Sequence, residues 1–188
     1  RWDVMNNTIN ILIVEDNQTF IDVLGMFLSE YKGSLLVTWE TCTSLAAAIQ
    51  RLEEPGIDVC LFDLNLPNGK GIETLLRLYD AYPEVPVVVL TADVSEELKK
   101  ICLSLGRADD FMGKFELGTS VKVGEFVWRL CNAARSFDKR SEVARQYRDL
   151  KAKITSEKEL CLKPDDSSIS VESDVKARNP KKDWRRVI

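Results

Sequence analysis

Five short apolar segments, each followed by an amphipathic one, constrain the fold of this chain more than any other feature. The most apolar, residues 58–67, is rich in branched and aromatic side chains and closes with Pro67, as is typical of a strand buried on both faces. Strands that alternate with helices form parallel sheets with right-handed crossovers. The alternation therefore predicts an α/β fold, a parallel sheet with helices on both faces.

The boundaries of the expected elements follow from the apolar pattern. Strands are predicted over residues 9–14, 34–41, 58–63, 87–90 and 109–112. Asn17, Ser44 and Ser95 are predicted to begin the helices that follow the first, second and fourth strands. The helix after the third strand is expected to begin at about Gly71, and the one after Ser95 to end near Gly106.

Polar residues stand at the carboxyl ends of four of these strands, where a parallel sheet brings them to one rim. They are Glu15, Asp16, Asp63, Thr91 and Lys114. Ligands of open parallel sheets bind at that rim. Three carboxylates held close together repel one another and raise each other's pKa unless a cation lies among them. Mg²⁺ fits this description, since it binds carboxylates and carbonyls and completes its octahedron with water or phosphate oxygens.

The two remaining rim residues suggest what the ion would act on. Lys114 supplies a fixed positive charge for a phosphate, and Thr91 supplies a hydroxyl donor. The chemistry that fits is phosphoryl transfer onto a carboxylate, which yields an aspartyl phosphate. The plain alternative is an Asp63 that only caps the turn after its strand.

Composition excludes several other classes of protein. The absence of histidine removes histidine acid–base catalysis and the commonest zinc ligand. The five cysteines are scattered without a Cys-x-x-Cys pair, so we interpret them as small buried hydrophobic residues rather than disulfides or metal ligands. No run approaches the ~18 apolar residues of a membrane helix and no signal segment opens the chain, so we expect no membrane association and a cytoplasmic protein.

Charge is unevenly distributed along the chain. Residues 1–116 carry 9 Lys and Arg against 19 Asp and Glu, whereas residues 117–188 carry 17 against 11. The acidic part suits a cation site and argues against a nucleic-acid surface there. The basic part leaves a polyanionic partner open.

The rim residues and their neighbours resemble the receiver domain of two-component response regulators, over roughly residues 9–137. The motifs that carry the resemblance are Glu15-Asp16, the turn with Asp63, Asn65, Pro67 and Gly71, the Leu90-Thr91-Ala92 turn, and Phe111-Met112-Gly113-Lys114. The resemblance implies a five-stranded doubly wound sheet in the strand order 2-1-3-4-5. It also implies a signalling module that accepts and loses a phosphoryl group autocatalytically rather than a metabolic enzyme.

The resemblance also implies a role for each residue of the metal site. Asp63 would be the phospho-acceptor and a ligand of Mg²⁺. Asp16 would bind the ion directly, and Glu15 would bind it through a water molecule. Asn65 would contribute its backbone carbonyl. The phosphoryl donor would be a sensor histidine kinase or a histidine phosphotransfer protein.

Three further residues would bind and report the phosphoryl group. Thr91 and Lys114 would hold its oxygens, and Phe111 would be an aromatic switch that turns inward when Thr91 moves. The plain alternative is that Phe111 only packs in the core, as aromatic residues in short strands usually do. The chain departs from the family pattern at Phe115, where the family usually has a proline after a cis peptide bond. A cis bond before a non-proline residue costs ~3–4 kcal/mol, so we expect a trans bond or a reshaped loop. Gly106 also lies one residue farther from Phe111 than in the family.

The last third of the chain has a different pattern. Residues 121–154 contain one glycine and no proline, which predicts one long helix extending from the sheet. Val143, Tyr147, Leu150 and Ile154, here called the heptad seam, recur at steps of four, three and four. This spacing is compatible with a solvated helix that leans on its own domain, or with a short coiled coil that joins two chains in a homodimer.

These patterns divide the chain into four parts. Residues 1–7 are expected to be disordered or an expression remnant, residues 8–137 the receiver domain, residues 138–155 the helical extension, and residues 156–188 a flexible polar tail. The output of the chain is left open.

Three alternatives to an active receiver remain. The first is a degenerate receiver that acts as a scaffold or dimerisation module. The second is a receiver fragment of a longer regulator with an enzymatic or DNA-binding output. The third, a flavin-binding domain of the same topology, needs a phosphate-cradling loop after the first strand; Glu15, Asp16 and Asn17 place negative charge there instead.

Overall fold

The computed structural model describes residues 7–67, 69, 71–104, 108–136, 146, 149 and 150. The elements in chain order are β1 (Thr8–Val14), α1 (Gln18–Ser29), β2 (Leu36–Cys42), α2 (Leu45–Leu52), β3 (Val59–Phe62), α3 (Ile72–Ala81), β4 (Val87–Thr91), α4 (Glu96–Ser104), β5 (Asp110–Gly113), the short 3₁₀ helix η2 (Lys114–Glu116) and α5 (Val123–Ala134). All five predicted strands are present. Their ends differ from the predicted ends by at most two residues. An apolar run shows where a strand lies, but it does not show which residue makes the last hydrogen bond of that strand.

The five strands form one parallel sheet in the order β2-β1-β3-β4-β5. β1 pairs with β2 on one side and β3 on the other, with Ile13 opposite both Thr41 and Leu61. β4 pairs with β3 and β5, with Val89 opposite both Phe62 and Phe111. The predicted doubly wound order 2-1-3-4-5 is confirmed, and the first and third strands end side by side.

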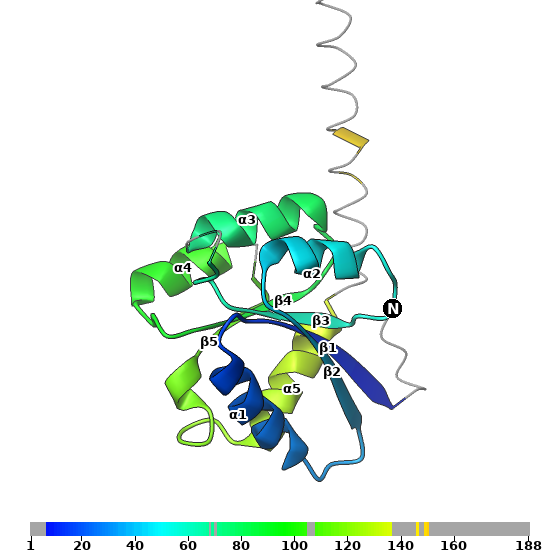
Figure 1. Ribbon diagram of the computed structural model, residues 1–188, viewed down its shortest axis with the longest axis vertical. Coiled ribbons are helices and arrows are strands. Elements are labelled where there is room, and N and C mark those ends of the chain that lie inside the picture. Colours follow the sequence, from blue (N-terminus) through cyan, green and yellow to red (C-terminus); the bar gives the residue numbers. More distant parts are fainter. Residues whose placement is uncertain are drawn as a thin grey trace, which may run out of the picture. The chain divides into compact units, whose positions relative to one another are not determined.

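Helices cover both faces of the sheet (Figure 1): α1 and α5 lie on one face, and α2, α3 and α4 on the other. Alternation along β1 assigns each side chain to a face. Ile11 and Ile13 pack with α1 and α5, whereas Leu12 and Val14 pack with the other three helices. Apolar side chains on both faces therefore fix the strand register, because a slip of one residue would exchange the two cores.

Capping residues set where the helices begin. The Asn17 side chain accepts the Phe20 backbone N–H at 3.1 Å, and Ser95 accepts the Leu98 N–H at 3.4 Å. Such caps satisfy backbone donors that have no partner within the helix. Gly71, with φ of 62°, precedes α3, a conformation that favours glycine. The predicted starts of these three helices are confirmed.

The loop after β5 is reshaped around Phe115, as expected. No peptide bond among the described residues is cis, and Lys114, Phe115 and Glu116 form η2. The Glu116 carboxylate accepts the backbone N–H of Gly113 at 3.1 Å. This contact closes the turn and holds the backbone on both sides of Lys114.

The extended C-terminal helix is seen only in part. α5 begins at Val123 and ends at Ala134, and the N–H of Ser136 bonds to the Ala133 carbonyl at 2.9 Å, three residues back. Gln146, Asp149 and Leu150 are helical, but residues 137–145 lie outside the described part of the chain. The helix predicted over residues 121–154 is therefore present over Val123–Ala134 and at those three positions.

Several other predictions concern residues that the structure does not describe. In the heptad seam only Leu150 is described, and it is 57 % exposed. Val143, Tyr147 and Ile154, the tail over residues 156–188, residues 1–6 and Gly106 lie outside the described residues. The seam and the boundaries of the four parts remain predictions.

The cysteines within the described residues behave as small hydrophobic side chains. Cys60, Cys102 and Cys131 are buried, Cys42 is half-buried, and all four are free thiols. Burial raises the pKa of each of them, which disfavours the reactive thiolate. Cys161 lies outside the described residues. A search of the described helices finds none that is both long and apolar enough to cross a membrane.

Candidate functional site

Three carboxylates meet at the carboxyl edge of the sheet. Glu15 and Asp16 follow β1, and Asp63 follows β3 on the adjacent strand. A ligand oxygen from each lies within 4.8 Å of the others. Glu15 and Asp63 are 3 % and 4 % exposed, whereas Asp16 is open to solvent. The structure thus brings together the predicted acidic residues, with two buried and one at the mouth of the site.

Lys114 joins the two buried carboxylates. Its Nζ lies 2.8 Å from Asp63 Oδ2 and 2.5 Å from Glu15 Oε2. Burial lowers the pKa of Lys114, but the hydrogen bonds to Asp63 and Glu15 outweigh that effect, and the pKa lies above its ordinary value. Burial raises the pKa of Glu15, and the Asp63 charge adds to this, although Lys114 opposes both. One ammonium therefore serves two carboxylates and leaves Glu15 short of compensating charge.

Backbone N–H groups bind the other oxygens of the buried pair. Asp63 Oδ1 accepts the N–H of Asn65 at 3.1 Å, and Glu15 Oε1 accepts the N–H of Asn17 at 3.2 Å. These contacts orient both carboxylates without adding a full positive charge. Asn65 is thus in contact with Asp63 through its N–H group, and the predicted role of its carbonyl is untested.

The donor set fits a small hard cation. It consists of oxygen atoms only, and with all three carboxylates ionised and Lys114 protonated it carries two excess negative charges. The Asp16 side chain makes no hydrogen bond or ion pair within the described part of the chain. Mg²⁺ selects such oxygen ligands and keeps several waters. Glu15, Asp16 and Asp63 are the residues that would hold it.

Thr91 and Phe111 lie on the neighbouring strands. Thr91 ends β4, is fully buried, and its hydroxyl accepts the Asp93 N–H at 3.3 Å. No hydrogen bond joins Thr91 to Asp63 among the residues described. Phe111 in β5 is 5 % exposed and packs in the core with α4. Its ring is therefore already inside, so an inward turn would have to start from a conformation other than this one.

Phe20 is a site residue that sequence reasoning missed. The Lys114 Nζ lies over its ring, 4.5 Å from the centroid. The available signal was its position: α1 begins directly after the acidic pair, and an aromatic residue in its first turn lies near the rim.

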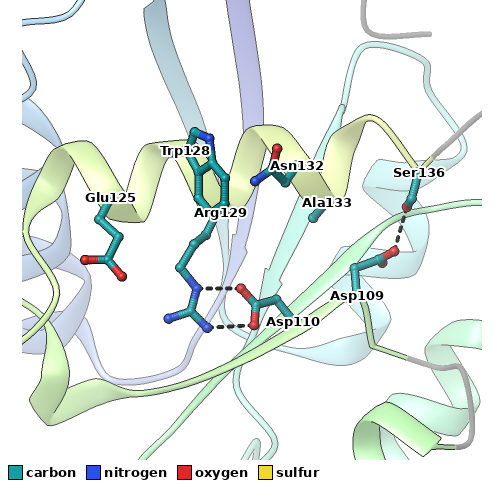
Figure 2. Close-up of a pocket in the computed structure, with 8 residues that line it drawn as sticks. All are labelled: Asp109, Asp110, Glu125, Trp128, Arg129, Asn132, Ala133 and Ser136. Atoms are coloured by element: carbon teal, nitrogen blue, oxygen red, sulfur yellow. Dashed lines mark hydrogen bonds and ion pairs between the residues drawn. The ribbon is translucent and has the colours of Figure 1, made fainter.

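A second missed contact ties α5 to the first residue of β5. Arg129 binds Asp110 through both carboxylate oxygens, at 2.5 and 2.6 Å, and donates to the Phe111 carbonyl at 3.1 Å. The pair lines a cavity of about 370 Å³. In the same cavity the Ser136 hydroxyl donates a hydrogen bond to the Asp109 carboxylate at 2.6 Å (Figure 2). The signal for it was an arginine next to the apolar stripe of a helix predicted to pack on the sheet.

Comparisons with known proteins agree with this arrangement. A family model described as the response regulator receiver domain matches residues 11–117. The chain is similar to the sensory transduction protein RegX3 of Mycobacterium bovis, at 35% identity over 105 residues, or 56% of this chain and 44% of the relative. It is also similar to the response regulator SaeR of Staphylococcus epidermidis, at 30% identity over 105 residues, or 56% and 43%. The chain thus spans less than half of the length of these relatives.

A solved structure shows the same fold. The signal receiver domain of an HD domain-containing protein from Pseudomonas fluorescens matches with a TM-score of 0.57 and 22% identity, over 71% of this chain and 92% of that domain. The family model covers more than half of the chain, and the residues at the rim are those on which the resemblance rested. The chain belongs to the response regulator receiver domains, the signalling modules of two-component systems.

Proposed function

We propose that this chain accepts a phosphoryl group on Asp63 in a Mg²⁺-dependent reaction, with the phosphohistidine of a kinase or a phosphotransfer protein as donor. An Asp63 oxygen forms a bond to phosphorus while the phosphorus–nitrogen bond of the donor breaks, and the electron pair leaves with the imidazole. Bound Mg²⁺ would neutralise charge that otherwise keeps the phosphoryl group and the carboxylates apart.

One observation carries the proposal: the buried Asp63 carboxylate lies 2.8 Å from the Lys114 ammonium inside a cluster of three carboxylates. A structural aspartate would be matched by its partner, as in a balanced ion pair. Here the cation is shared, so the site has spare negative charge for a metal and a lysine that can turn to a phosphoryl oxygen. Lys114 binds as a point charge on a flexible stem. It can therefore exchange one oxygen partner for another, because its contacts do not require a fixed two-point geometry.

Thr91 and Phe111 are proposed to report the phosphoryl group. Within the described part of the chain, the Thr91 hydroxyl binds only the Asp93 N–H, so donating to a phosphoryl oxygen would bring a contact that exists in one state alone. Such a differential contact is the only means by which the group can shift an equilibrium between conformations. The proposed output is a change in the segment from β4 to η2.

The first test is metal-dependent phosphorylation. The protein is incubated with acetyl phosphate, with Mg²⁺ or with EDTA, and intact mass is followed over time. We expect one phosphoryl group with Mg²⁺ and almost none with EDTA. Asp16→Asn should lower the rate roughly 10- to 100-fold, because a metal ligand at the mouth of the site is lost.

Asp22→Asn is the matched control. Asp22 is an exposed carboxylate in α1 that bonds to Gln18 at 2.9 Å and takes no part in the cluster. Its rate should equal that of the wild type. Equal rates of phosphorylation with Mg²⁺ and with EDTA would contradict the metal site. An equal loss of rate in Asp16→Asn and in Asp22→Asn would contradict it as well. Absence of any phosphoryl group on a folded, Mg²⁺-loaded protein would favour the degenerate receiver.

A further inference from the structure

The position of the Lys114 ammonium depends on more than its two carboxylates. Its side chain is 18 % exposed, with Asp63 and Glu15 on the nitrogen at 2.8 and 2.5 Å. An ammonium has three N–H donors, and the two carboxylates account for two of them. The nitrogen also lies over the Phe20 ring, 4.5 Å from its centroid. An aromatic face attracts a cation at this distance.

The Phe20 ring is itself held in place from two sides. The backbone N–H of Phe20 binds the Asn17 side chain at 3.1 Å, which fixes the first turn of α1 directly after the acidic pair. The ring is half-buried and packs against the core between the sheet, α1 and α5. The ring therefore has packing contacts with the core in addition to its contact with Lys114.

We propose that Phe20 is a positioning residue for phosphoryl acceptance, acting through Lys114. Resting on the function proposed above, this inference adds that the ring keeps the ammonium at the rim and shields one side of it from water. Lys114 must pass from a carboxylate oxygen to a phosphoryl oxygen during the reaction. A ring face allows that movement, because it attracts the ammonium anywhere over the face within about 6 Å of the centroid, whereas a hydrogen bond weakens steeply away from its axis.

A purely structural role for Phe20 predicts a different outcome, and Phe27 offers the matched control. Phe27 is on the same helix and is half-buried against the same core. Its ring makes an edge-to-face contact with the ring of Phe126, with the two centroids 5.7 Å apart. It has no part in the acidic cluster. Phe27→Leu and Phe20→Leu each remove one phenyl ring from the same hydrophobic core. Equal effects of the two variants on the rate of phosphorylation would therefore indicate a packing role alone.

The main experiment measures the rate of phosphorylation by acetyl phosphate with saturating Mg²⁺. We expect Phe20→Leu to lower the rate on the order of 3- to 30-fold, the range of a partly buried cation–π contact. Phe20→Tyr should retain a rate near that of the wild type, since the ring face is kept. Phe27→Leu should lower thermal stability and leave the rate unchanged.

A double-mutant cycle then tests whether the effect passes through Lys114. In a Lys114→Met background, Phe20→Leu should cause no further loss, because the cation that the ring positions is gone. An equal loss in both backgrounds, or a Phe20→Tyr variant as slow as Phe20→Leu, overturns the proposal.

A spectroscopic readout separates this inference from the proposed function. The ε-methylene proton signals of Lys114, identified by their loss in Lys114→Met, should be shifted by the ring current in the wild type and in Phe27→Leu. They should move toward ordinary lysine positions in Phe20→Leu. If they do not move, Phe20 does not position Lys114, even where the wild type is phosphorylated. If they move but the wild type takes no phosphoryl group, the proposed function fails and the role in acceptance falls with it.

Discussion

Arg129 and Lys114 both form buried or partly buried ion pairs, but the two sites differ in how their charges are balanced. Arg129 meets Asp110 one to one, through two parallel hydrogen bonds of 2.5 and 2.6 Å. Lys114 meets two carboxylates at once, and an oxygen of a third, Asp16, lies within 4.8 Å of theirs. The first pair is charge-balanced and geometrically fixed, as bidentate arginine pairs are. The second is short of positive charge and has a cation that can change partners.

This difference separates a structural contact from a functional one. The Arg129 pair needs nothing further, so its task is to hold α5 against β5. In the proposed function, a metal ion and a phosphoryl group would join the Lys114 cluster and balance its charge. Perturbed charges of this kind concentrate at functional sites. Three variants test the comparison, from the largest expected effect to the smallest.

Replacing the lysine should affect both chemistry and stability. Lys114→Met leaves Asp63 and Glu15 buried without their shared cation, so the free energy of unfolding should fall by about 3 kcal/mol or more. The rate of phosphorylation should fall roughly 10- to 100-fold, because a positioned positive charge is lost from the transition state. Chemical denaturation and acetyl phosphate kinetics measure the two effects. Lys122→Met, at an exposed lysine, should change neither.

Replacing the arginine should affect stability alone. Arg129→Met leaves Asp110 without its partner, and because both side chains remain partly exposed we expect a loss of about 1–3 kcal/mol in the free energy of unfolding. Phosphorylation at a temperature where the variant is folded should proceed at the wild-type rate. A slower reaction would show that the α5 contact is coupled to the site, and the division drawn above would be wrong.

A third pair, on the surface, should matter least. Arg51 binds Glu40 through two hydrogen bonds of 2.6 and 2.7 Å, but the Glu40 side chain is 54% exposed. Arg51→Met should lower the free energy of unfolding by less than about 1 kcal/mol, and less still in high salt. The Arg51 hydrogen bond lowers the pKa of Glu40. The contribution is therefore present above the ordinary glutamate pKa and is lost as the pH falls through the lowered value.

The strands and their order could be predicted because burial on both faces leaves a β-branched run few alternatives. The helix starts at Asn17 and Ser95 were predictable for a local reason, since a cap is decided by residues three positions apart. The rim residues followed from topology: in a parallel sheet, a residue that follows its strand must lie at the carboxyl edge. The acidic cluster and Lys114 were therefore within reach of the sequence.

Contacts between side chains of distant elements were not. Arg129 and Asp110 are 19 positions apart, and an amphipathic stripe shows which face of a helix is buried but not which strand end it meets. The ring of Phe20 over Lys114 depends on the angle at which α1 leaves the sheet. Each is set by tertiary geometry, which periodicity does not encode.

The most direct test of the central claim is to map the phosphorylated residue. After reaction with acetyl phosphate and Mg²⁺, the acyl phosphate is reduced with borohydride and the modified position is located by peptide mass spectrometry. The prediction is one modified residue, Asp63, in the wild type and in Arg129→Met, and none in Asp63→Asn. A phosphoryl group on Asp16, Glu15 or any other residue, or stoichiometric labelling that persists in Asp63→Asn, would contradict the account.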